Sequence, residues 1–480
     1  MIKISDSFKT DDKKLDALYR GARSVLLDAV KPFGDYKLAV RSSEDERVNA
    51  SSEIMCAETL ARYDIETAIE CVKAFIMTAR EDGRIAGEIV KKQEDIFCDF
   101  SRLAGFCIAE EALSIFYMAK KKELTYLDRL YDGLKRFDAY IWSTHDCNGN
   151  KLAELFSEKE LADGVNPARY APIVSSDNGR ISEISPFPVE TALMASFVYR
   201  LKATLAQIAK LLENGEAEKY AEEADALFAS VKKNFWISEA GVCYDRDYRG
   251  SMIPYVGIEN LDMMYYGAFD NEMAEEFVKR HVMNPDEFFT RLPLPDIPAD
   301  LGGTVRGVTY RKMIRALERY GFYTELAKLS ELVLDGLSEQ NAFTEYYDPG
   351  TCEPIKKQIC ADCSPTAAAV IELVARSFGV SIDFEDVIWG AKGHKGENTS
   401  EYSFRWGGDT YSVYAESETT SGFINGKLLF TVTNGVRVAT DWFGDLPRVT
   451  NITAETLDCV FVYRDHTYSF TLEPNKSWQP

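Results

Sequence analysis

Residues 305–338 read VRGVTYRKMIRALERYGFYTELAKLSELVLDGLS, and this stretch indicates two helices in close succession. In its second half, apolar side chains recur at helical spacing and form one stripe: Leu326, Leu329, Val333 and Leu337. Tyr-Gly-Phe separates the two periodic segments, and a glycine at such a point is typical of a tight connection. We therefore expect a helix pair made of 305–320 and 322–338.

The same periodicity recurs along the chain as far as about residue 385. Asp64 is the expected N-cap of a segment with a matching stripe, formed by Ile65, Ala68, Ile69, Val72 and Ile76. Twelve helices are expected in this way, mostly in closely spaced pairs: 11–30, 53–62, 65–80, 97–119, 122–141, 188–213, 216–234, 258–267, 270–281, 305–320, 322–338 and 364–378. The sequence therefore predicts a mainly α domain over residues 1–385.

The pattern becomes strand-like after residue 385. Asn425-Gly426 and Asn434-Gly435 lie between β-branched and aromatic runs, which is the signature of β-hairpins. We expect residues 386–480 to form a small antiparallel β module. Its aromatic residues Trp406, Tyr411 and Tyr414 could bind a sugar, but packing of the sheet onto the helical domain is the favoured interpretation.

Composition and charge exclude several classes of function. Hydrophobic residues make up 46% and charged residues 28%, as in a globular protein, and the net charge is −22. Nucleic acids and anionic lipids both require a local excess of Lys and Arg, so neither is an expected partner. The N-terminal MIKISDSFKTDDKK has no apolar signal segment, and no run of about 18 apolar residues occurs. We expect a soluble, acidic protein that does not bind membranes.

The ten cysteines are scattered, and several fall inside apolar helical patterns. This distribution indicates buried, reduced thiols and hence a cytoplasmic location. The lone C-A-D-C at 360–363 lacks the second ligand pair that a zinc site needs, so core and loop thiols are favoured over a metal or redox site. We expect neither a metal nor a cofactor.

Long non-helical segments hold most of the prolines, glycines and paired acids: 143–187, 236–257, 283–304 and 341–363. Loops of this length are usually functional. The first contains Glu154, Glu158, Glu160 and Asp163, and the last contains FTEYYDPG with Glu345 and Asp348. Two carboxylates that face one cleft are what glycoside hydrolysis needs, and neighbouring tyrosines suit sugar rings.

Other chemistries find no support in the sequence. The G-x-S-x-G elbow, the G-x-x-x-x-G-K-[ST] phosphate loop and a G-x-G-x-x-G after a strand are all absent. The four histidines form no convincing catalytic arrangement. Arg306, near an expected helix start, could hold a hydroxyl or carboxylate in a cleft, or could pin the loop through a salt bridge.

The order of these segments resembles that of the (α/α)6-barrel glycoside hydrolases around family 63, the mannosylglycerate and glucosylglycerate hydrolase type, with trehalases and debranching domains as more distant relatives. The resemblance is carried by a series of motifs across residues 11–380: EDGRIAGEI (81–89), DCNGNKLAEL (146–155), FFTRLPLPDIPAD (288–300), TVRGVTY (304–310), TEYYDPGTCEP (344–354) and DCSPTAAAV (362–370). It implies an (α/α)6 barrel, a six-hairpin toroid, followed by the β module.

The resemblance also implies roles for particular residues. Glu345 matches the general base of the family's E-Y-Y-D-P loop, and Arg306 matches the arginine of its W-R-G motif. The general acid should lie in ADGVNPARY, where Asp163 is the nearest aspartate, Val165 occupies the aligned position, and Glu160 and Glu154 are alternatives. The implied substrate-binding residues are Arg306, Tyr346, Tyr347, Tyr310, Arg169 and Glu53.

The leading hypothesis is thus an inverting glycoside hydrolase that acts on a small α-glycoside or oligosaccharide in a pocket at one rim of the barrel. The family's tryptophans are replaced around Thr304-Val305 and at Cys363, so the pocket differs from that of relatives. The alternatives are a catalytically silent sugar-binding or regulatory barrel, and a barrel that performs lyase, epimerase or phosphorolysis chemistry. The sequence does not determine the sugar, the anomeric configuration, the aglycone or the oligomeric state.

Overall fold

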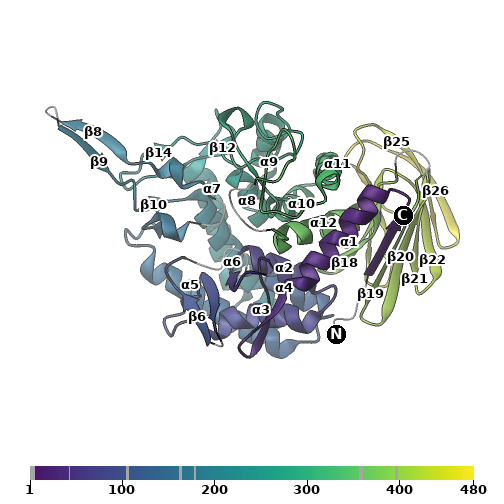
Figure 1. The fold of residues 1–480 in the computed structure, drawn as a ribbon, viewed down its shortest axis with the longest axis horizontal. Coiled ribbons are helices and arrows are strands. Elements are labelled where there is room, and N and C mark those ends of the chain that lie inside the picture. Colours follow the sequence, from purple (N-terminus) through teal and green to yellow (C-terminus); the bar gives the residue numbers. More distant parts are fainter. Residues whose placement is uncertain are drawn as a thin grey trace.

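The computed structural model describes residues 6–42, 44–93, 95–103, 108–161, 165–177, 180–355, 361–394 and 398–480. Helices occupy one side of the molecule and two β-sheets the other (Figure 1). Within the described residues there are twelve α-helices: α1 Lys13–Asp28, α2 Ser52–Leu60, α3 Ile65–Met77, α4 Glu110–Met118, α5 Leu124–Thr144, α6 Ala192–Leu211, α7 Ala217–Phe235, α8 Glu259–Tyr266, α9 Asn271–Phe277, α10 Thr309–Arg319, α11 Tyr323–Gln340 and α12 Ser364–Phe378. No helix of this part of the chain is long and apolar enough to cross a membrane.

The even-numbered and odd-numbered helices differ in burial. All side chains of α2 and α8 are buried, as are nearly all of those of α4 and α12. Helices α1, α3, α5, α7 and α11 instead bury one stripe, such as Leu326, Leu329, Val333 and Leu337 of α11. A helix that is buried on every side belongs to an inner layer, whereas an amphipathic helix covers that layer. The twelve helices therefore form two layers.

The inner helices contact one another in a closed series. Helix α2 packs against α4, α4 against α6, α6 against α8, α8 against α10 and α10 against α12, and α12 packs back onto α2. The outer helices pack on neighbouring members of this series, for example α3 on α2 and α4, and α11 on α10 and α12. The loops that precede α10 and α12 lie side by side, because residues 305–306 pair with residues 346–347.

Charged side chains fill part of the space that the inner helices enclose. Arg311, Arg315 and Arg319 lie four residues apart on one face of α10. Arg315 contacts Glu58 of α2 at 2.6 Å and Glu111 of α4 at 3.4 Å, and Arg319 contacts Glu110 at 2.8 Å. Arg311 pairs with the same Glu58. Buried charges of this kind are tolerated because each cation has a carboxylate partner.

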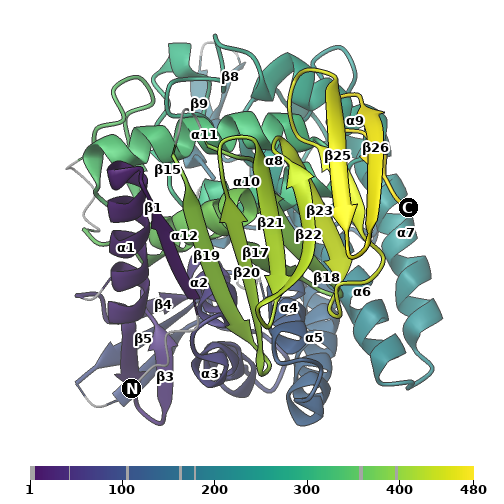
Figure 2. The ribbon, with the colours of Figure 1, turned by 90° about the vertical axis from the view of Figure 1, so that its right-hand side faces the viewer.

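Two antiparallel sheets form the β part, and Figure 2 shows the larger one facing the viewer with the helices behind it. Its seven strands lie in the order β1 Asp6–Thr10, β19 Ser400–Trp406, β20 Asp409–Ala415, β21 Thr419–Ile424, β22 Lys427–Thr433, β25 Leu457–Tyr463 and β26 His466–Leu472. The second sheet has the order β17 Val380–Asp383, β18 Asp386–Ala391, β23 Val436–Asp441, β24 Arg448–Asn451 and β27 Ser477–Trp478. Both Asn-Gly pairs lie in tight connections, β21–β22 and the turn that leads into β23.

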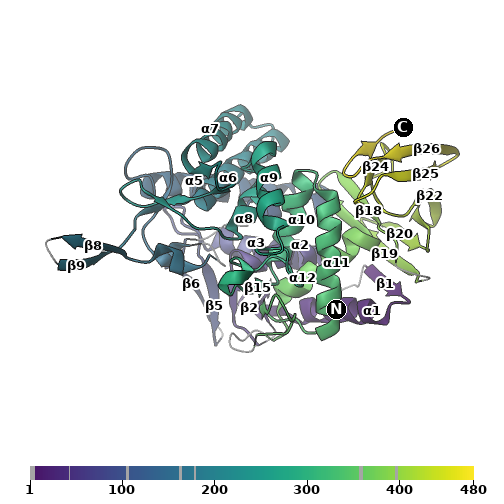
Figure 3. The ribbon, with the colours of Figure 1, turned by 90° about the horizontal axis from the view of Figure 1, so that it is seen from above.

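Short strands also occur in the loops of the helical part. They are β2 Val30–Phe33, β3 Tyr36–Ala39, β4 Arg47–Asn49, β5 Glu88–Lys92, β6 Asp95–Asp99, β7 Glu154–Leu155, β8 Ile173–Asp177, β9 Arg180–Ile184, β10 Val189–Glu190, β11 Trp236–Ile237, β12 Val242–Cys243, β13 Asp245–Arg246, β14 Met252–Ile253, β15 Val305–Arg306 and β16 Tyr346–Tyr347. The hairpin β8–β9 projects away from the rest of the molecule (Figures 1 and 3).

Some expected helix bounds differ from the structure, and two strand pairings bear on the expected division of the chain. Residues 97–99 belong to strand β6 rather than to a helix, and the fourth helix is assigned from Glu110. The division after residue 385 falls inside the β17–β18 hairpin, because Val380–Asp383 already pairs with β18. Strand β1, from the N-terminus, pairs with β19 in the larger sheet. Such long-range pairing leaves no local signal in the sequence, and a division of the chain into 1–385 and 386–480 stays a prediction.

Of the three C-terminal aromatics Trp406, Tyr411 and Tyr414, Trp406 packs the larger sheet onto the helical part. Trp406 is buried, and its Nε1 donates a hydrogen bond to the Met118 carbonyl of α4 at 2.7 Å. Tyr411 is also buried, whereas Tyr414 is exposed on the outer face of the sheet. The described cysteines form no disulfide with one another, and most of them, Cys363 included, are buried; Cys107 and Cys360 lie outside the described residues.

Candidate functional site

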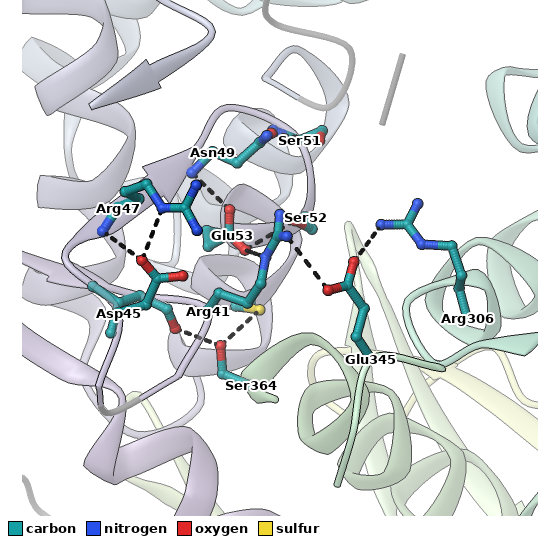
Figure 4. A network of polar contacts seen from close by, with 12 residues as sticks. Arg41, Asp45, Arg47, Asn49, Ser51, Ser52, Glu53, Arg306, Glu345 and Ser364 are labelled. Atoms are coloured by element: carbon teal, nitrogen blue, oxygen red, sulfur yellow. Dashed lines mark hydrogen bonds and ion pairs between the residues drawn. The ribbon is translucent and has the colours of Figure 1, made fainter. Parts of the chain in front are cut away.

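Glu345 and Arg306 are brought together by a two-residue strand pair. Strand β16 follows Glu345 directly and pairs with β15, so that Arg306 lies opposite Tyr346. The Gly307 amide donates a hydrogen bond to the Glu345 carbonyl at 3.1 Å, which extends the pairing. Arg306 Nη2 then lies 2.8 Å from Glu345 Oε1 (Figure 4). The two residues come from different loops, and backbone pairing sets their geometry.

Position 307 has no room for a side chain, because α12 approaches its backbone closely. An ideal Cβ on Gly307 would lie 1.9 Å from Thr366 Oγ1 of α12, well inside van der Waals contact. That hydroxyl also donates to the Thr344 carbonyl at 2.7 Å, one residue before Glu345. The glycine of the V-R-G segment therefore lets the Arg306 loop and the Glu345 loop share one support on α12.

A second arginine, Arg41, contacts Glu345 from the opposite side. Its Nη1 lies 3.5 Å from Glu345 Oε2, and its Nε lies 3.2 Å from Glu53 Oε1 (Figure 4). Its backbone carbonyl accepts a hydrogen bond from the Ser364 amide at 2.7 Å, at the start of α12. Sequence reasoning missed Arg41, because it follows β3 in a segment that carries no recognised motif. Arg41 bridges two carboxylates that lie far apart in the sequence.

Glu53 holds Arg41 in place. Its side chain is 1% exposed, and it accepts hydrogen bonds from the Asn49 amide at 2.6 Å and from Ser52 Oγ at 2.9 Å, in addition to the Arg41 contact. Three donors hold this buried carboxylate in one orientation. Glu53 was expected to bind substrate, but both of its oxygens are already engaged by protein groups.

The four side chains of this site differ in their exposure to solvent. The side chains of Glu345 and Arg41 are 15% and 22% exposed, whereas those of Arg306 and Glu53 are 7% and 1% exposed. The arrangement thus presents one partly accessible carboxylate, held between two guanidinium groups. Such a group can accept a proton or a hydrogen bond from a molecule above it, while its orientation is kept by charge-assisted hydrogen bonds.

Asp163, the expected general acid, lies outside the described residues. Its two alternatives are engaged within their own loop. Glu154 is 7% exposed and accepts from the Cys147 amide at 2.9 Å and from Asn148 Nδ2 at 3.0 Å. Burial acts to raise the pKa of Glu160, but hydrogen bonds from His145 and from the Phe156 amide lower this pKa below its ordinary value. A general acid needs a raised pKa, so Glu160 has the wrong shift for that role.

Arg169 belongs to a second buried cluster that the sequence did not reveal. Its guanidinium pairs with Asp245 and lies 3.4 Å from Glu259 Oε1 at the start of α8. Asp245 also accepts from Tyr170 at 2.6 Å and from the Ala192 amide at 2.9 Å. Burial raises the pKa of Glu259 above its ordinary value, against the opposing charge of Arg169. Arg169 thus ties the loop after residue 165 to α6 and α8.

The three expected tyrosines occupy different environments. Tyr346 is partly exposed and lies beside Arg306, with the guanidinium carbon 5.4 Å from the ring centre. Tyr310 and Tyr347 are fully buried, and their hydroxyls donate to the carbonyls of Pro293 at 3.0 Å and Ala342 at 2.7 Å. Both side chains support the two loops from within the core, and a contact of either with substrate stays a prediction. No group of metal-ligating side chains occurs in the described part of the chain.

Comparison with known proteins finds similarity to glycoside hydrolases. Residues 127–300 match the family model described as mannosylglycerate hydrolase MGH1-like glycoside hydrolase domain. Over 188 residues the chain is 26% identical to a mannosylglycerate hydrolase of Rubrobacter radiotolerans, a match that covers 36% of this chain and 42% of that protein. The chain therefore matches less than half the length of this curated relative.

Solved structures share the fold. The family 63 mannosylglycerate hydrolase of Thermus thermophilus in complex with glucose superposes with a TM-score of 0.60 at 14% identity, over 74% of this chain and 99% of that one. A family 78 rhamnosidase of Bacillus sp. GL1 gives 0.60 at 14% identity, over 86% of this chain and 40% of that one. The resemblance to glycoside hydrolases of the family 63 type is thereby confirmed.

Proposed function

We propose that the protein is an inverting glycoside hydrolase whose site lies at the rim of an (α/α)6 barrel. The closed series of six inner helices supports the barrel assignment, and outer helices pack on five of them, α2, α4, α6, α10 and α12. The site lies where α2 and α12 begin, with Arg306 and Glu345 on loops that precede α10 and α12. The observation that carries the proposal is the partly exposed carboxylate of Glu345, set between Arg306 and Arg41.

In the proposed reaction Glu345 acts as the general base. Its Oε1 is held by Arg306 at 2.8 Å, whereas Oε2 makes only the longer 3.5 Å contact with Arg41 and is the freer oxygen. Oε2 takes a proton from a water molecule whose oxygen attacks the anomeric carbon. The bond to the leaving oxygen breaks, and Asp163 transfers a proton to that oxygen. Inversion requires the two carboxyl groups to be roughly 6.5–9.5 Å apart, to leave room for the water.

We propose a small α-glycoside or oligosaccharide as the substrate, and mannosylglycerate, after the name of the curated relative, is the first compound to test. Tyr346 and Arg41 border the carboxylate and are the proposed direct contacts. Arg306, Arg169 and Glu53 are assigned to positioning, because the structure buries them in ion pairs. A cytoplasmic location remains part of the proposal.

The test compares four proteins on mannosylglycerate, glucosylglycerate and aryl α-glycosides: wild type, Glu345→Gln, Asp163→Asn and a matched control, Glu353→Gln. Glu353 lies on the same loop and is exposed. We expect the first two variants to lose at least about a hundredfold in kcat, as is usual for a missing acid or base, and the control to keep wild-type activity. Proton NMR of the first-formed sugar should show the anomer opposite to that of the substrate. Equal activity of wild type and Glu345→Gln would refute the assignment.

A catalytically silent sugar-binding barrel is the second candidate. It is favoured by the acid side of the site, where Val165 occupies the aligned position and Glu154 and Glu160 are engaged within their loop. In that case neither wild type nor any variant turns over a substrate, but wild type still binds the sugar and Glu345→Gln weakens the binding in calorimetry. Phosphorolysis, a further chemistry of the same fold, would show itself as turnover that depends on added phosphate.

A further inference from the structure

A cavity of about 550 Å³ lies between the helical and β parts, far along the inner helices from the Glu345 site. Its walls include residues that follow the C-terminal ends of α2 and α4, and the turn between β19 and β20. Figure 2 shows this turn at the end of the larger sheet that lies over α3 and α4. The Glu345 site, in contrast, lies at the N-terminal ends of α2 and α12, so the two locations are separate.

The charged side chains that line this cavity are all cationic. They are Arg62, Lys120, Lys122 and Arg405, and among the described lining residues there is neither an aspartate nor a glutamate. The chain as a whole has a net charge of −22, so the sign of the local charge is opposite to that of the protein. Cations gathered at one concave place raise the local concentration of anions there.

Two of these cations are already compensated. Arg62 is 5% exposed, and its guanidinium donates to the Val380 carbonyl at 2.7 Å and lies 3.7 Å from Asp6. Lys120 Nζ lies 3.3 Å from Asp409 Oδ2. Lys122 and Arg405 form no ion pair within the part of the chain that the structure describes. Two positive charges therefore face the cavity without a protein counter-charge.

Contacts within the protein fix the position of Lys120 in the cavity wall. Lys120 stacks over the Trp406 ring at 4.4 Å, and Trp406 is anchored by its hydrogen bond to Met118. The next residue, Gly407, has a φ of +58°, and a Cβ there would lie 2.0 Å from Lys120 Cε. The turn thus needs glycine to make room for the lysine. Lys120 and Trp406 therefore form a fixed part of the cavity wall.

We propose that this cavity binds a small organic phosphate ester. A phosphate dianion matches the two uncompensated charges of Lys122 and Arg405, and a guanidinium fork suits phosphate oxygens. Ala61, Ile65, Met118, Ala119 and Trp406 form an apolar wall that would contact the organic part. The volume falls within the range of about 300–1,000 Å³ that is typical of small-molecule sites. The assignment is independent of the proposed hydrolase activity.

Isothermal titration calorimetry of the full chain at low salt tests the proposal, with glucose 6-phosphate, inorganic phosphate and glucose as separate probes. The variants are Lys122→Ala/Arg405→Ala, the charge-matched control Lys210→Ala/Lys427→Ala, and Glu345→Gln. Lys210 and Lys427 are exposed and lie away from the cavity. We expect saturable binding of glucose 6-phosphate that the first double variant weakens at least about tenfold, since charge-assisted contacts are lost.

The control double variant and Glu345→Gln should bind glucose 6-phosphate like wild type, which separates this cavity from the Glu345 site. Thermal unfolding without ligand should be unchanged in Lys122→Ala/Arg405→Ala, because both side chains are exposed. No saturable binding, or equal binding by both double variants, would overturn the site. Inorganic phosphate bound as tightly as glucose 6-phosphate would overturn the assignment to an organic ester.

Discussion

Glu111 of α4 offers a quantitative test of the charged interior. Its side chain is 1% exposed, and Arg315 contacts it at 3.4 Å while also contacting Glu58 and Glu110. Burial raises the pKa of Glu111 to about 8, Arg315 opposes this shift, and the charges of Glu58 and Glu110 reinforce it. We predict that Glu111→Gln, which keeps the shape and removes the titration, makes the stability of the protein less dependent on pH.

The sign follows from the proton balance. An unfolded glutamate titrates near about 4.3, so between that pH and about 8 the folded state holds a proton that the unfolded state releases. The free energy of unfolding therefore falls as the pH rises through this window, and it stops falling above it. At about 1.4 kcal/mol per pKa unit, the full effect amounts to at most about 5 kcal/mol, and relaxation around the buried group would reduce it to a few kcal/mol.

Urea unfolding monitored by tryptophan fluorescence at pH 5.5 and pH 8.5 measures this difference. Wild type should lose a few kcal/mol more than Glu111→Gln between the two conditions. Glu222→Gln, on the exposed face of α7, is the control and should follow wild type. Parallel pH dependence of wild type and Glu111→Gln would refute the argument, because it would mean that Glu111 is ionised in the folded protein throughout this range.

Four further predictions concern the candidate site. Arg306→Met should lower kcat/KM by about a hundredfold, because Glu345 loses its 2.8 Å contact and its orientation; steady-state kinetics on the best substrate measures this. Arg41→Ala should lower kcat/KM by about tenfold while leaving the melting temperature within a few degrees of wild type, since Arg41 is the more exposed partner. Gly307→Ala should destabilise the fold by about 1–3 kcal/mol in urea unfolding, because the new methyl group meets Thr366. Glu160→Gln should retain wild-type kcat, and a loss as large as that of Asp163→Asn would show that Glu160, despite its lowered pKa, is the proton donor.

Helix periodicity carried most of the information that the sequence holds about the fold. All twelve expected helices overlap helices of the described structure, because an apolar stripe at 3.6-residue spacing is a local property of the chain. The Asn-Gly turns of the β part were readable for the same reason. The E-Y-Y-D-P and V-R-G segments singled out Glu345 and Arg306, and the structure places them in contact.

Tertiary structure alone decided what surrounds these residues. Arg41 reaches Glu345 across about three hundred residues of sequence, and β1 joins a sheet whose other strands lie near the opposite end of the chain. The sequence predicts that Tyr310 and Tyr347 contact the sugar, whereas in the structure their hydroxyls donate hydrogen bonds to backbone carbonyls in the core. Composition and spacing report which side chains are present and which face of an element they share. Burial, counter-charges and long-range strand pairing depend on how distant segments pack, and no local pattern encodes them.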